Sequence, residues 1–410
     1  MTVPMATRRS IVHMDLDTFF VSCERLLDSR LNQKPILIGG TSERGVVASC
    51  SYEARRFGVR SGMSMKMAKE RCPEAICIKG NTQTYTKFSR MVTEIVKEVS
   101  PVYEKMSIDE FYIDFTGMDR FFGIWTYASE LRARIIKETG LPISFGLSEN
   151  KTVSKVATGE AKPNNQLHIN YGKEKDFLAP LSVQKIPMVG PKTYQTLCSL
   201  GVKRIGTLQT LPLELVEQAL GANGRSIWTK AQGIDQSPVE PYNERKSISN
   251  ERTFHQDTID VAKLSGILAA MAENLTFQLR RAGKLTGTVT VKIRYADFQT
   301  QTLQQQIAYT AADHELLPLV QELFKRLYQR RVLVRLIGLR FSSLVGGAHQ
   351  LQLFDHQNLS YPALYKALDK IRERYGDRAV LRAIGLEARS IGHYNPFNGE
   401  PPILLANRST

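Results

Sequence analysis

Apolar and polar residues alternate with two different periods along the first 170 positions, which predicts strands interleaved with helices. Short apolar runs predict the strands, and longer amphipathic stretches between them predict helices. Such an alternation is typical of an α/β or α+β domain. The predicted strands are Ser10–Met14, Pro35–Ile38, Val46–Ser49, Ala75–Ile78, Pro101–Lys105, Phe111–Phe115 and Ile143–Leu147, and the clearest helices are Tyr85–Ser100 and Ile124–Thr139.

The pattern changes twice further along the chain. A Pro- and Gly-containing run at Ile186–Pro191 opens a helical segment that continues to about Gly233, and the polar run Asp235–Asn243 has the composition of a linker. Strands and helices alternate again beyond it, which predicts a second, separate α+β domain. Its predicted strands are Lys246–Phe254, Thr286–Tyr295 and Val334–Phe341, with helices near Val261–Arg281 and His314–Tyr328.

Composition narrows the choice of partner. The 410 residues include 55 Lys and Arg against 40 Asp and Glu, a formal charge of +15, which favours nucleic acid or an acidic membrane surface. No apolar stretch approaches the ~18 residues of a membrane span, and the first residues lack the apolar core of a signal peptide. The five cysteines form no CxxC pair, a pattern that favours reduced thiols in the cytosol. We therefore expect a cytoplasmic protein that binds nucleic acid and no membrane.

Basic residues gather in two acid-free blocks of the second domain. Most charged blocks are simply solvated faces, but two of them in a domain that follows a linker favour contacts with a phosphate backbone. The blocks are Arg280, Arg281, Lys284, Lys292 and Arg294, and then Arg326, Arg330, Arg331, Arg335 and Arg340.

Two carboxylate clusters are the most informative chemistry. His13–Asp17 (HMDLD) ends one predicted strand, and Ser107–Glu110 (SIDE) precedes another. Carboxylates gathered at strand ends repel one another unless cations lie between them, and oxygen ligands without Cys or His favour Mg²⁺. Carboxylate-bound Mg²⁺ ions serve phosphoryl and nucleotidyl transfer. Neighbouring strand residues face opposite ways, so Asp109 and Glu110 can meet one metal only at a hairpin turn or bulge; otherwise they form an ordinary solvated turn.

Four ordered motifs together resemble a known family. HMDLDTFFVSCE at positions 13–24, Ser51–Val59 (SYEARRFGV), SIDEFYID at positions 107–114 and Ala161–Asn164 (AKPN) resemble the Y-family translesion DNA polymerases, and most closely the bacterial DinB branch. The resemblance implies an α+β multidomain, right-hand polymerase. Its expected parts are a palm with a ferredoxin-like antiparallel sheet (1–18 and 81–170), small fingers (19–80), a helix-hairpin-helix thumb (171–235), a linker (236–246), an α+β little finger (247–345) and a C-terminal extension (346–410).

The resemblance also implies roles for the carboxylates. Asp15, Asp109 and Glu110 would be the catalytic metal ligands, with the backbone carbonyl of Leu16 as a further ligand, and Asp17 would support them. Two Mg²⁺ ions, for which Mn²⁺ could substitute, would activate the primer 3′-OH and hold the triphosphate.

Nucleotide contacts follow from the same resemblance. Phe20 matches the steric gate, an aromatic ring that excludes a ribose 2′-OH. Phe19 is counted with the nucleotide contacts, although an ordinary core position is the preferred interpretation of its ring. Ser49 belongs to the run of small residues Gly45–Cys50, which in the family roofs the nascent base pair. Triphosphate contacts are expected from Tyr52, Arg55 and Lys162, with Arg56 as the competitor of Arg55.

DNA contacts are expected from the thumb and the little finger. The hairpin at Ile186–Thr193 resembles a phosphate-binding helix-hairpin-helix, except that Met188 replaces its usual first glycine, which puts a close backbone approach there in doubt. The expected contacts are Val189, Gly190, Lys192, Thr193, Lys246, Arg252, Arg294 and Arg340.

One motif lies beyond the polymerase body. The stretch Gln350–Phe354 (QLQLF) resembles the peptide by which bacterial replication proteins bind the β sliding clamp, with Gln350, Leu351, Leu353 and Phe354 as the contacts. A Leu-Phe pair in a loop is otherwise often a packing contact. The following extension has apolar residues at helical spacing (Tyr361, Leu364, Tyr365, Leu368 and Ile371), and the sequence assigns it no function.

We therefore expect a DNA-templated polymerase for low-fidelity translesion synthesis without proofreading, acting as a monomer on primer-template DNA, dNTPs and the clamp. The alternative in the same family is a UmuC-like subunit that depends on accessory proteins. Alternatives of other classes are a non-catalytic DNA- and clamp-binding scaffold, and a two-metal nuclease, which would need neither a sugar gate nor a triphosphate cluster.

Overall fold

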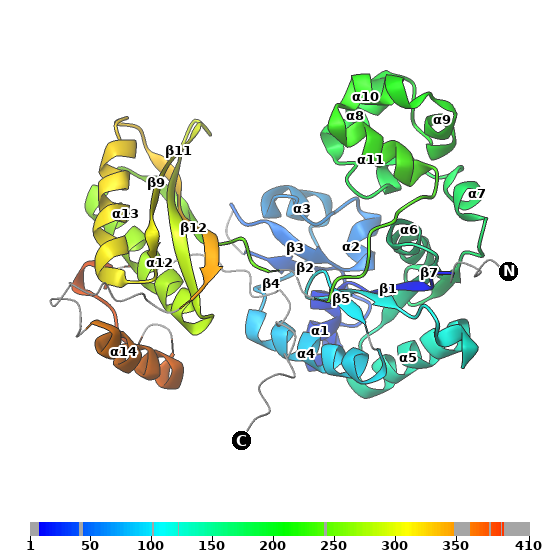
Figure 1. Ribbon diagram of the computed structural model, residues 1–410, viewed down its shortest axis with the longest axis horizontal. Coiled ribbons are helices and arrows are strands. Elements are labelled where there is room, and N and C mark those ends of the chain that lie inside the picture. Colours follow the sequence, from blue (N-terminus) through cyan, green and yellow to red (C-terminus); the bar gives the residue numbers. More distant parts are fainter. Residues whose placement is uncertain are drawn as a thin grey trace, which may run out of the picture. The chain divides into compact units, whose positions relative to one another are not determined.

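The computed structural model describes residues 8–40, 44–100, 102–121, 123–241, 244–347, 361–376, 379–386 and 388. The chain forms two compact units, and the second begins at Glu244 (Figure 1). Predicted metal ligands and triphosphate contacts all belong to the first unit, whereas Lys246, Arg252, Arg294 and Arg340 belong to the second.

A five-stranded sheet is the centre of the first unit. Its strand order is β5-β6-β1-β7-β8, and β1 pairs antiparallel with both β6 and β7, whereas β7 and β8 run parallel. The strands are β1 (Ile11–Leu16), β5 (Tyr103–Lys105), β6 (Glu110–Asp114), β7 (Ile143–Ser148) and β8 (Gln166–His168). The predicted strands of this sheet are confirmed within a few residues. β8, which the apolar pattern did not indicate, has only three residues and was missed.

Helices cover both faces of this sheet (Figure 1). On one face, α4 (Thr82–Val99) and α5 (Ile124–Thr139) bury apolar side chains against Val12, Met14 and Leu16 of β1. The opposite face, which carries His13 and Asp15, is covered by α6 (Lys151–Ala161). Alternation along β1 therefore sends its apolar residues into the core and its polar residues towards α6.

A second, three-stranded sheet has the order β3-β2-β4. Its small core contains Leu37, Val47, Ala54 and Met65, whereas Ile36 and Ile38 of β2 contribute to the core of the five-stranded sheet. Its elements are β2 (Ile36–Gly39), β3 (Val47–Cys50), β4 (Ile76–Ile78), α2 (Tyr52–Arg56) and α3 (Met65–Arg71); α1 (Phe19–Leu27) links it to β1 by way of the 3-10 helix η1 (Ser29–Leu31).

Short helices follow the five-stranded sheet and pack on α6. Val153, Val156 and Ala157 of α6 share a core with Leu197 and Ile227 of these helices. Polar contacts also tie the segment down, since the Thr152 hydroxyl donates to Asp235 at 2.7 Å. The helices are α7 (Glu174–Leu178), α8 (Pro191–Ser199), α9 (Ile205–Thr210), α10 (Leu213–Leu220) and α11 (Ala222–Ala231), with the 3-10 helix η3 (Val183–Lys185).

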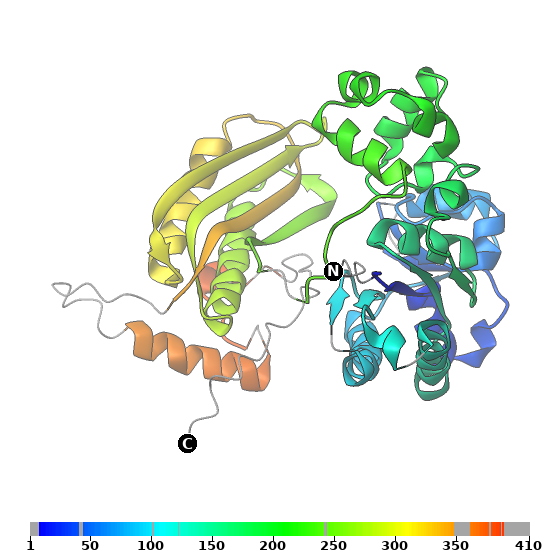
Figure 2. The ribbon, with the colours of Figure 1, turned by 45° about the vertical axis from the view of Figure 1, so that its right-hand side comes forward.

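The second unit is a four-stranded antiparallel sheet with the order β11-β10-β12-β9 (Figure 2). Helices α12 (Val261–Arg281) and α13 (Asp313–Leu327) pack against one of its faces and enclose the core. The strands are β9 (Ser247–Thr258), β10 (Lys284–Tyr295), β11 (Thr300–Thr310) and β12 (Val334–Gly346). Three of these strands and both helices were predicted. β11 was missed because its sequence, TQTLQQQIAYT, is mostly polar on an edge strand.

The extension forms the helix α14 (Tyr361–Tyr375), as its apolar spacing predicts. Two residues of the predicted apolar spacing, Leu364 and Ile371, do not attach the helix, because they stay 48% and 39% exposed. Instead, Asp369 accepts two hydrogen bonds from Arg280 of α12, at 2.7 and 2.8 Å, and the ring of Tyr361 stacks on His314 of α13 with 3.9 Å between centroids. Such a bidentate charged pair is among the stronger polar contacts.

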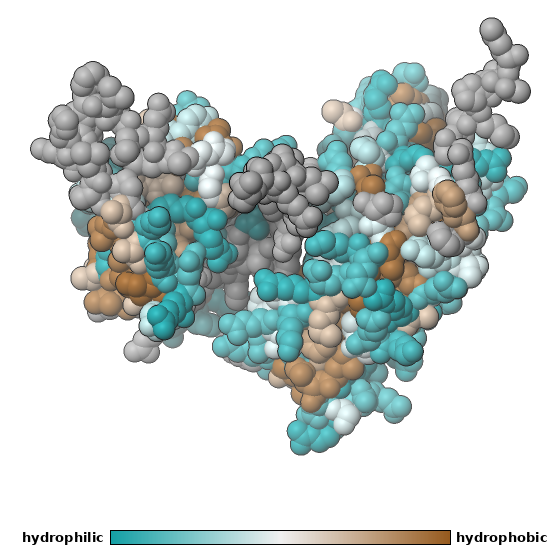
Figure 3. Space-filling view, turned by 60° about the horizontal axis from the view of Figure 1, so that its bottom comes forward, coloured by the Kyte–Doolittle hydropathy of each residue, from teal (hydrophilic) through white to brown (hydrophobic). Residues whose placement is uncertain are grey.

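Much of the described surface drawn in Figure 3 is hydrophilic, with apolar residues in separate patches. Among the described residues, no helix has the length and apolarity needed to cross a bilayer. The five cysteines are free thiols, as predicted.

Candidate active site

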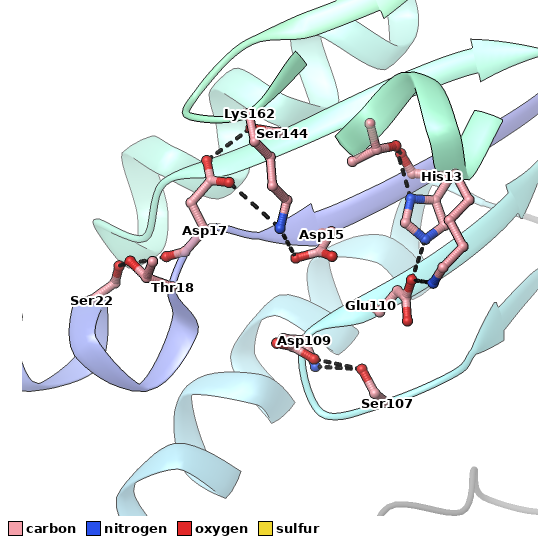
Figure 4. A network of polar contacts seen from close by, with 12 residues as sticks. His13, Asp15, Asp17, Thr18, Ser22, Ser107, Asp109, Glu110, Ser144 and Lys162 are labelled. Carbon is pink, nitrogen blue, oxygen red and sulfur yellow. Dashed lines mark hydrogen bonds and ion pairs between the residues drawn. The ribbon is translucent and has the colours of Figure 1, made fainter. Parts of the chain in front are cut away.

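The carboxylates lie at one edge of the five-stranded sheet. Asp15 at the end of β1 is paired in register with Glu110 at the start of β6. The N–H of Leu16 donates to the backbone carbonyl of Asp109 at 3.0 Å, which brings Asp109 to the same edge. Figure 4 shows the three carboxylates beside one another where the two strands meet.

A tight hairpin turn explains how Asp109 and Glu110 reach the same side. The chain reverses between β5 and β6, with the N–H of Met106 donating to the carbonyl of Glu110 at 3.0 Å, so Asp109 lies in the turn and Glu110 in the strand. Helix α4 supports the turn from behind, since the Ser89 hydroxyl donates to the carbonyl of Ile108 at 2.5 Å. The predicted hairpin is therefore confirmed.

Each carboxylate of this edge has its own partner. Asp15 is ion-paired with Lys162, and Asp109 accepts from the Ser107 hydroxyl at 2.5 Å. Glu110 accepts from the His13 ring at 2.6 Å and is also ion-paired with Lys155. Burial raises the pKa of Asp15, and the neighbouring Asp109 carboxylate raises it further, while Lys162 opposes both effects. The edge thus concentrates negative charge that nearby cations offset.

A divalent cation fits the donor set of this edge but not the present orientation of its side chains. Carboxylate oxygens and a backbone carbonyl are the ligands that Mg²⁺ prefers. In the part of the chain that the structure describes, however, no three His, Cys, Asp or Glu side chains converge on one point. The reason is visible in the contacts, because Asp15 turns to Lys162 and Glu110 turns to His13 and Lys155.

Asp17 differs from the other carboxylates. It is 1% exposed and accepts from the Ser144 hydroxyl at 2.8 Å, the Asn164 N–H at 2.6 Å and the Tyr52 hydroxyl at 3.4 Å. Lys162 also lies 3.7 Å from it. With both oxygens bonded inside the protein, Asp17 links the strand end to the loop after α6 and to α2.

The expected triphosphate residues come together around Asp15 and Asp17. Tyr52 and Arg55 lie one turn apart on α2, with the guanidinium 4.9 Å from the ring centre, and Lys162 follows α6. Arg55 is half-buried whereas Arg56 is exposed and belongs to another side of the helix. Burial raises the pKa of Tyr52, and the Asp17 carboxylate raises it further, so the phenol stays protonated and can donate.

The aromatic pair after β1 divides into two roles. Phe19 is 2% exposed and packs in the core, which supports the core interpretation of its ring. A nucleotide contact by Phe19 stays a prediction. Phe20 is only partly buried, and its ring stacks on Tyr85 with 4.4 Å between centroids. The Tyr85 hydroxyl donates to Glu24 at 2.6 Å, which fixes the stacking partner. Ser49 is 9% exposed, next to the exposed Ala48.

The hairpin before α8 leaves fewer free donors than expected. Val189 is buried in the core of the helical segment and its N–H donates to Ile186, while the N–H of Gly190 donates to Met188. Burial and this internal bond correct the expectation that Val189 binds DNA, whereas Gly190 is exposed and its contact with DNA stays a prediction. Lys192 and Thr193 remain, since the first-turn N–H groups of a helix have no acceptor within it. Met188 has φ +82°, a conformation that favours glycine.

The expected DNA contacts of the second unit divide between two faces of its sheet. Arg340 on β12 lies opposite Thr290, and Arg294 on β10 lies opposite Thr300, all on the face that the helices leave open. Arg252 is paired in register with Ile337, a core residue, so it lies on the helix-covered face. That position corrects the expectation that Arg252 contacts DNA together with the other two. Lys246 is exposed just before β9.

Several members of the basic blocks are already paired. Arg280 holds Asp369 and Asp313, Lys284 pairs with Glu244, and Arg330 pairs with Asp297 at 3.0 Å. Arg280 in particular is a structural residue of the extension, so the interpretation of its block as a phosphate-binding surface is wrong at that position. The QLQLF stretch (Gln350, Leu351, Leu353 and Phe354) lies outside the described residues.

Sequence reasoning missed several residues of this site. His13, Lys155 and Ser107 each bond to a carboxylate of the edge, and Tyr85 backs Phe20. A signal for two of them was present: His13 lies two positions before Asp15 on the same face of a strand, and Lys155 lies seven before Lys162.

Comparisons with known proteins agree with this geometry. Residues 14–159 match the impB/mucB/samB family, and residues 245–353 match the C-terminal domain of the same family. The DNA polymerase IV of Dehalococcoides mccartyi strain CBDB1 is 41% identical over 376 residues, covering 91% of this chain and 96% of that protein. The chain belongs to the impB/mucB/samB family. The DNA polymerase IV of Desulfatibacillum aliphaticivorans, a further relative, is 34% identical over 380 residues, covering 91% of this chain and 96% of that protein.

Solved structures match the fold of this chain as well. A Y-family DNA polymerase chimera of Dbh and Dpo4 superposes with a TM-score of 0.74 at 24% identity, covering 82% of this chain and all of that one. The predicted α+β polymerase fold and the resemblance to DinB-like Y-family polymerases are confirmed. The chain is a DNA-directed DNA polymerase of the translesion type, and the UmuC-like alternative is not favoured.

Proposed function

We propose that this chain extends a primer by two-metal nucleotidyl transfer, with Asp15, Asp109, Glu110 and the carbonyl of Leu16 as the metal ligands. The supporting observation is the register pairing of Asp15 with Glu110 beside the Asp109–Leu16 backbone bond. Polymerases act on DNA and dNTPs and depend on divalent metal ions. Bound Mg²⁺, or Mn²⁺ in its place, would supply Lewis-acid stabilisation of the charge that develops on the phosphates.

The remaining residues of the edge bind and orient the nucleotide. Lys162, Arg55 and the Tyr52 hydroxyl neutralise and donate to the triphosphate. Ser49 of the three-stranded sheet belongs to the roof over the nascent base pair. Asp17 holds this arrangement together without binding metal, since its Oδ2 already accepts from Ser144 and Asn164 and its Oδ1 accepts from Tyr52.

Sugar selection belongs to Phe20. Its ring is held flat against Tyr85, with 17° between the ring planes, so it cannot easily rotate away from a bulky substituent. An aromatic ring fixed in this way excludes a 2′-OH by contact rather than by hydrogen bonding.

DNA binding is assigned to two surfaces that read no sequence. The first-turn N–H groups of Lys192 and Thr193 suit a phosphate at the start of α8. The open face of the second unit offers Arg294 and Arg340 among Thr, Ser and Gln side chains, and Lys246 lies at its edge. Contacts to phosphates of this kind give affinity and register, not specificity.

The domain assignment follows the family. The five-stranded sheet with α4–α6 is the palm (1–18 and 81–170), the three-stranded sheet is the fingers (19–80), the helical segment is the thumb (171–235), and the second unit contains the little finger (247–345) after the linker (236–246). We assign β-clamp binding to the QLQLF stretch, and a monomeric, cytoplasmic enzyme to the chain.

Replacement of Glu110 by alanine tests the proposal. The variant should lose Mg²⁺-dependent primer extension by roughly 10²–10³-fold or more, and it should bind primer-template DNA with the affinity of the unaltered enzyme. Lengthening of the primer at a near-normal rate by Glu110→Ala would refute the assignment of the ligands, and shortening of the primer by the unaltered enzyme would indicate a nuclease.

A further inference from the structure

The His13 side chain on β1 is buried beneath α6 and bonded at both ends of its ring. It is 1% exposed, its Nε2 lies 2.6 Å from Oε1 of Glu110, and its Nδ1 lies 2.8 Å from the hydroxyl of Thr158 on α6. Its ring also contacts Tyr112 at 4.7 Å between centroids. A buried imidazole with two polar partners has one orientation.

The partners decide where the ring carries its proton. An ionised carboxylate only accepts hydrogen bonds, so Nε2 must carry the hydrogen in order to bond to Glu110. This holds for the neutral and for the charged ring. The Thr158 hydroxyl, which also lies within 2.9 Å of the backbone carbonyls of His13 and Ser154, holds the Nδ1 side of the ring.

Close packing of α6 makes the contact with Thr158 possible. Gly146 on β7 is paired in register with His13, and a Cβ at that position would lie 2.3 Å from the carbonyl oxygen of Ser154 and 2.6 Å from the N–H nitrogen of Thr158. Only glycine therefore lets α6 approach the sheet closely enough.

The His13 contact fixes one half of the Glu110 carboxylate. Oε1 accepts from His13 and is ion-paired with Lys155, and no hydrogen bond to Oε2 is found within the described part of the chain. A carboxylate that is held by one oxygen keeps the other in a defined direction.

We propose that His13 is a positioning residue for Glu110, held by Thr158, and that it sets the affinity of this edge for a divalent cation. The inference rests on the proposed role of Glu110 as a ligand. His13 itself would touch neither metal nor substrate.

Two substitutions separate hydrogen bonding from packing. His13→Phe keeps a ring against Tyr112 and removes the donor, whereas His13→Gln retains an N–H donor at the ε position. Thr158 can still donate to Ser154, and Glu110 keeps Lys155, so neither variant leaves these groups without a partner. Tyr112→Phe is the matched control, since it keeps the aromatic neighbour of His13 and leaves the bond to Glu110 unchanged.

Metal affinity is measured without catalysis. Mn²⁺ is titrated by electron paramagnetic resonance into the full-length enzyme bound to a dideoxy-terminated primer-template and the next dNTP. His13→Phe should raise the half-saturating Mn²⁺ concentration by roughly 10–100-fold. His13→Gln should recover most of the loss, and Tyr112→Phe should bind as the unaltered enzyme does. Unchanged binding by His13→Phe would overturn the proposal, and so would equal losses in both His13 variants.

A second measurement needs no buried substitution. The protein has seven histidines, and long-range ¹H–¹⁵N NMR of the histidine-labelled enzyme reports which ring nitrogen of each is protonated. His13 should carry its hydrogen on Nε2, with a shift that moves in Glu110→Gln. A neutral ring protonated on Nδ1 would contradict the proposal. If Glu110→Ala extends primers normally, the proposed ligand set fails instead; if that variant is inactive while His13→Phe binds Mn²⁺ normally, only the positioning role fails.

Discussion

The carboxylate edge of the five-stranded sheet and the open face of the sheet in the second unit both gather charge, but in opposite ways. At the edge, Asp15, Asp17 and Glu110 are largely buried and each bonds to particular donors. On the open face, Arg294 and Arg340 lie among polar side chains. Buried polar groups interact strongly because the surrounding dielectric is low, so the loss of a single group should change activity or stability greatly. Exposed cations contribute to binding additively, and salt screens their charges.

The largest expected effect contrasts two neighbouring carboxylates of the edge. Asp15→Asn should reduce primer extension by roughly 10²–10³-fold or more without lowering stability, because burial raises the pKa of Asp15 and a neutral side chain avoids this desolvation cost. Asp17→Asn should instead lower stability by roughly 2–3 kcal/mol, since its buried donors lose an ionised acceptor. Primer extension assays and thermal unfolding of both variants measure these effects. Loss of stability in Asp15→Asn together with loss of activity alone in Asp17→Asn would contradict the assigned roles.

Replacement of the steric-gate residue tests whether a single apolar side chain affects catalysis as strongly as a charged side chain of the edge does. Phe20→Ala should reduce discrimination between dNTPs and rNTPs by roughly 10–100-fold, as measured by single-nucleotide incorporation rates. Tyr85→Phe is the control, because it keeps the stacked ring and loses only the hydroxyl bond to Glu24. Equal discrimination in Phe20→Ala and the unaltered enzyme would show that the sugar is selected elsewhere.

Substitutions on the open face should change the salt dependence of DNA binding rather than abolish binding. Joint replacement of Arg294 and Arg340 by alanine should reduce the slope of log affinity against log salt by about two, one for each phosphate contact. DNA binding by fluorescence anisotropy at several salt concentrations measures the slope. Arg330→Ala, whose side chain pairs with Asp297, should leave it nearly unchanged. A large loss of affinity with an unchanged slope would argue against phosphate contacts.

Acid should reduce the stability that Asp235 contributes, a carboxylate that bonds to Thr152 of α6 and is not one of the proposed metal ligands. Although burial opposes it, hydrogen bonds from Ser237 and Thr152 lower the pKa of Asp235 below its usual value. Because the pKa is lower in the folded than in the unfolded chain, ionised Asp235 stabilises the fold at pH values above the unfolded pKa of about 4. This contribution is lost as the pH falls through the folded-state pKa. Asp235→Asn should therefore cost about 1–2 kcal/mol at pH 7, and the difference from the unaltered chain should shrink below pH 4. Thermal unfolding of both chains at several pH values measures this difference in stability. A difference that stays constant with pH would exclude the proposed link to the ionisation of Asp235.

The smallest effect concerns backbone strain at Met188. Because its φ of +82° favours glycine, Met188→Gly should stabilise the chain by roughly 0.5–1 kcal/mol, after the entropy that glycine loses on folding is subtracted. The thermal midpoint of the unaltered and changed chains gives the answer. Met188→Ala, which keeps a Cβ, is the control and should show no gain.

The sequence identified elements and chemistry well where apolar periodicity or a motif was strong. All strands with an apolar run were found, whereas β8 is very short and β11 is a polar edge strand that gives little periodic signal. Asp15, Asp109 and Glu110 were grouped from the family resemblance, on the condition that a hairpin turn or bulge brings Asp109 and Glu110 to one side. The identity of their partners depends on α6 packing across the sheet, a tertiary contact that brings Thr158 to His13 and that local patterns do not encode.

The difference between local sequence patterns and tertiary contacts also explains the wrong expectations. Arg252, Arg280 and Val189 were assigned to DNA from charge or motif position, and each is committed to the helix-covered face, the extension or a core. Strand register and burial separate such residues from their exposed neighbours, and neither can be read from a charge count.

Anomalous scattering from Mn²⁺ tests the ligand set most directly. Crystals of the enzyme with primer-template DNA and a non-hydrolysable dNTP analogue would be soaked in Mn²⁺ and measured near the manganese absorption edge. We predict two anomalous peaks bound by Asp15, Asp109, Glu110 and the carbonyl of Leu16, with Asp17 still bonded to Ser144 and Asn164. Peaks coordinated by Asp17, or placed away from Glu110, would contradict the account.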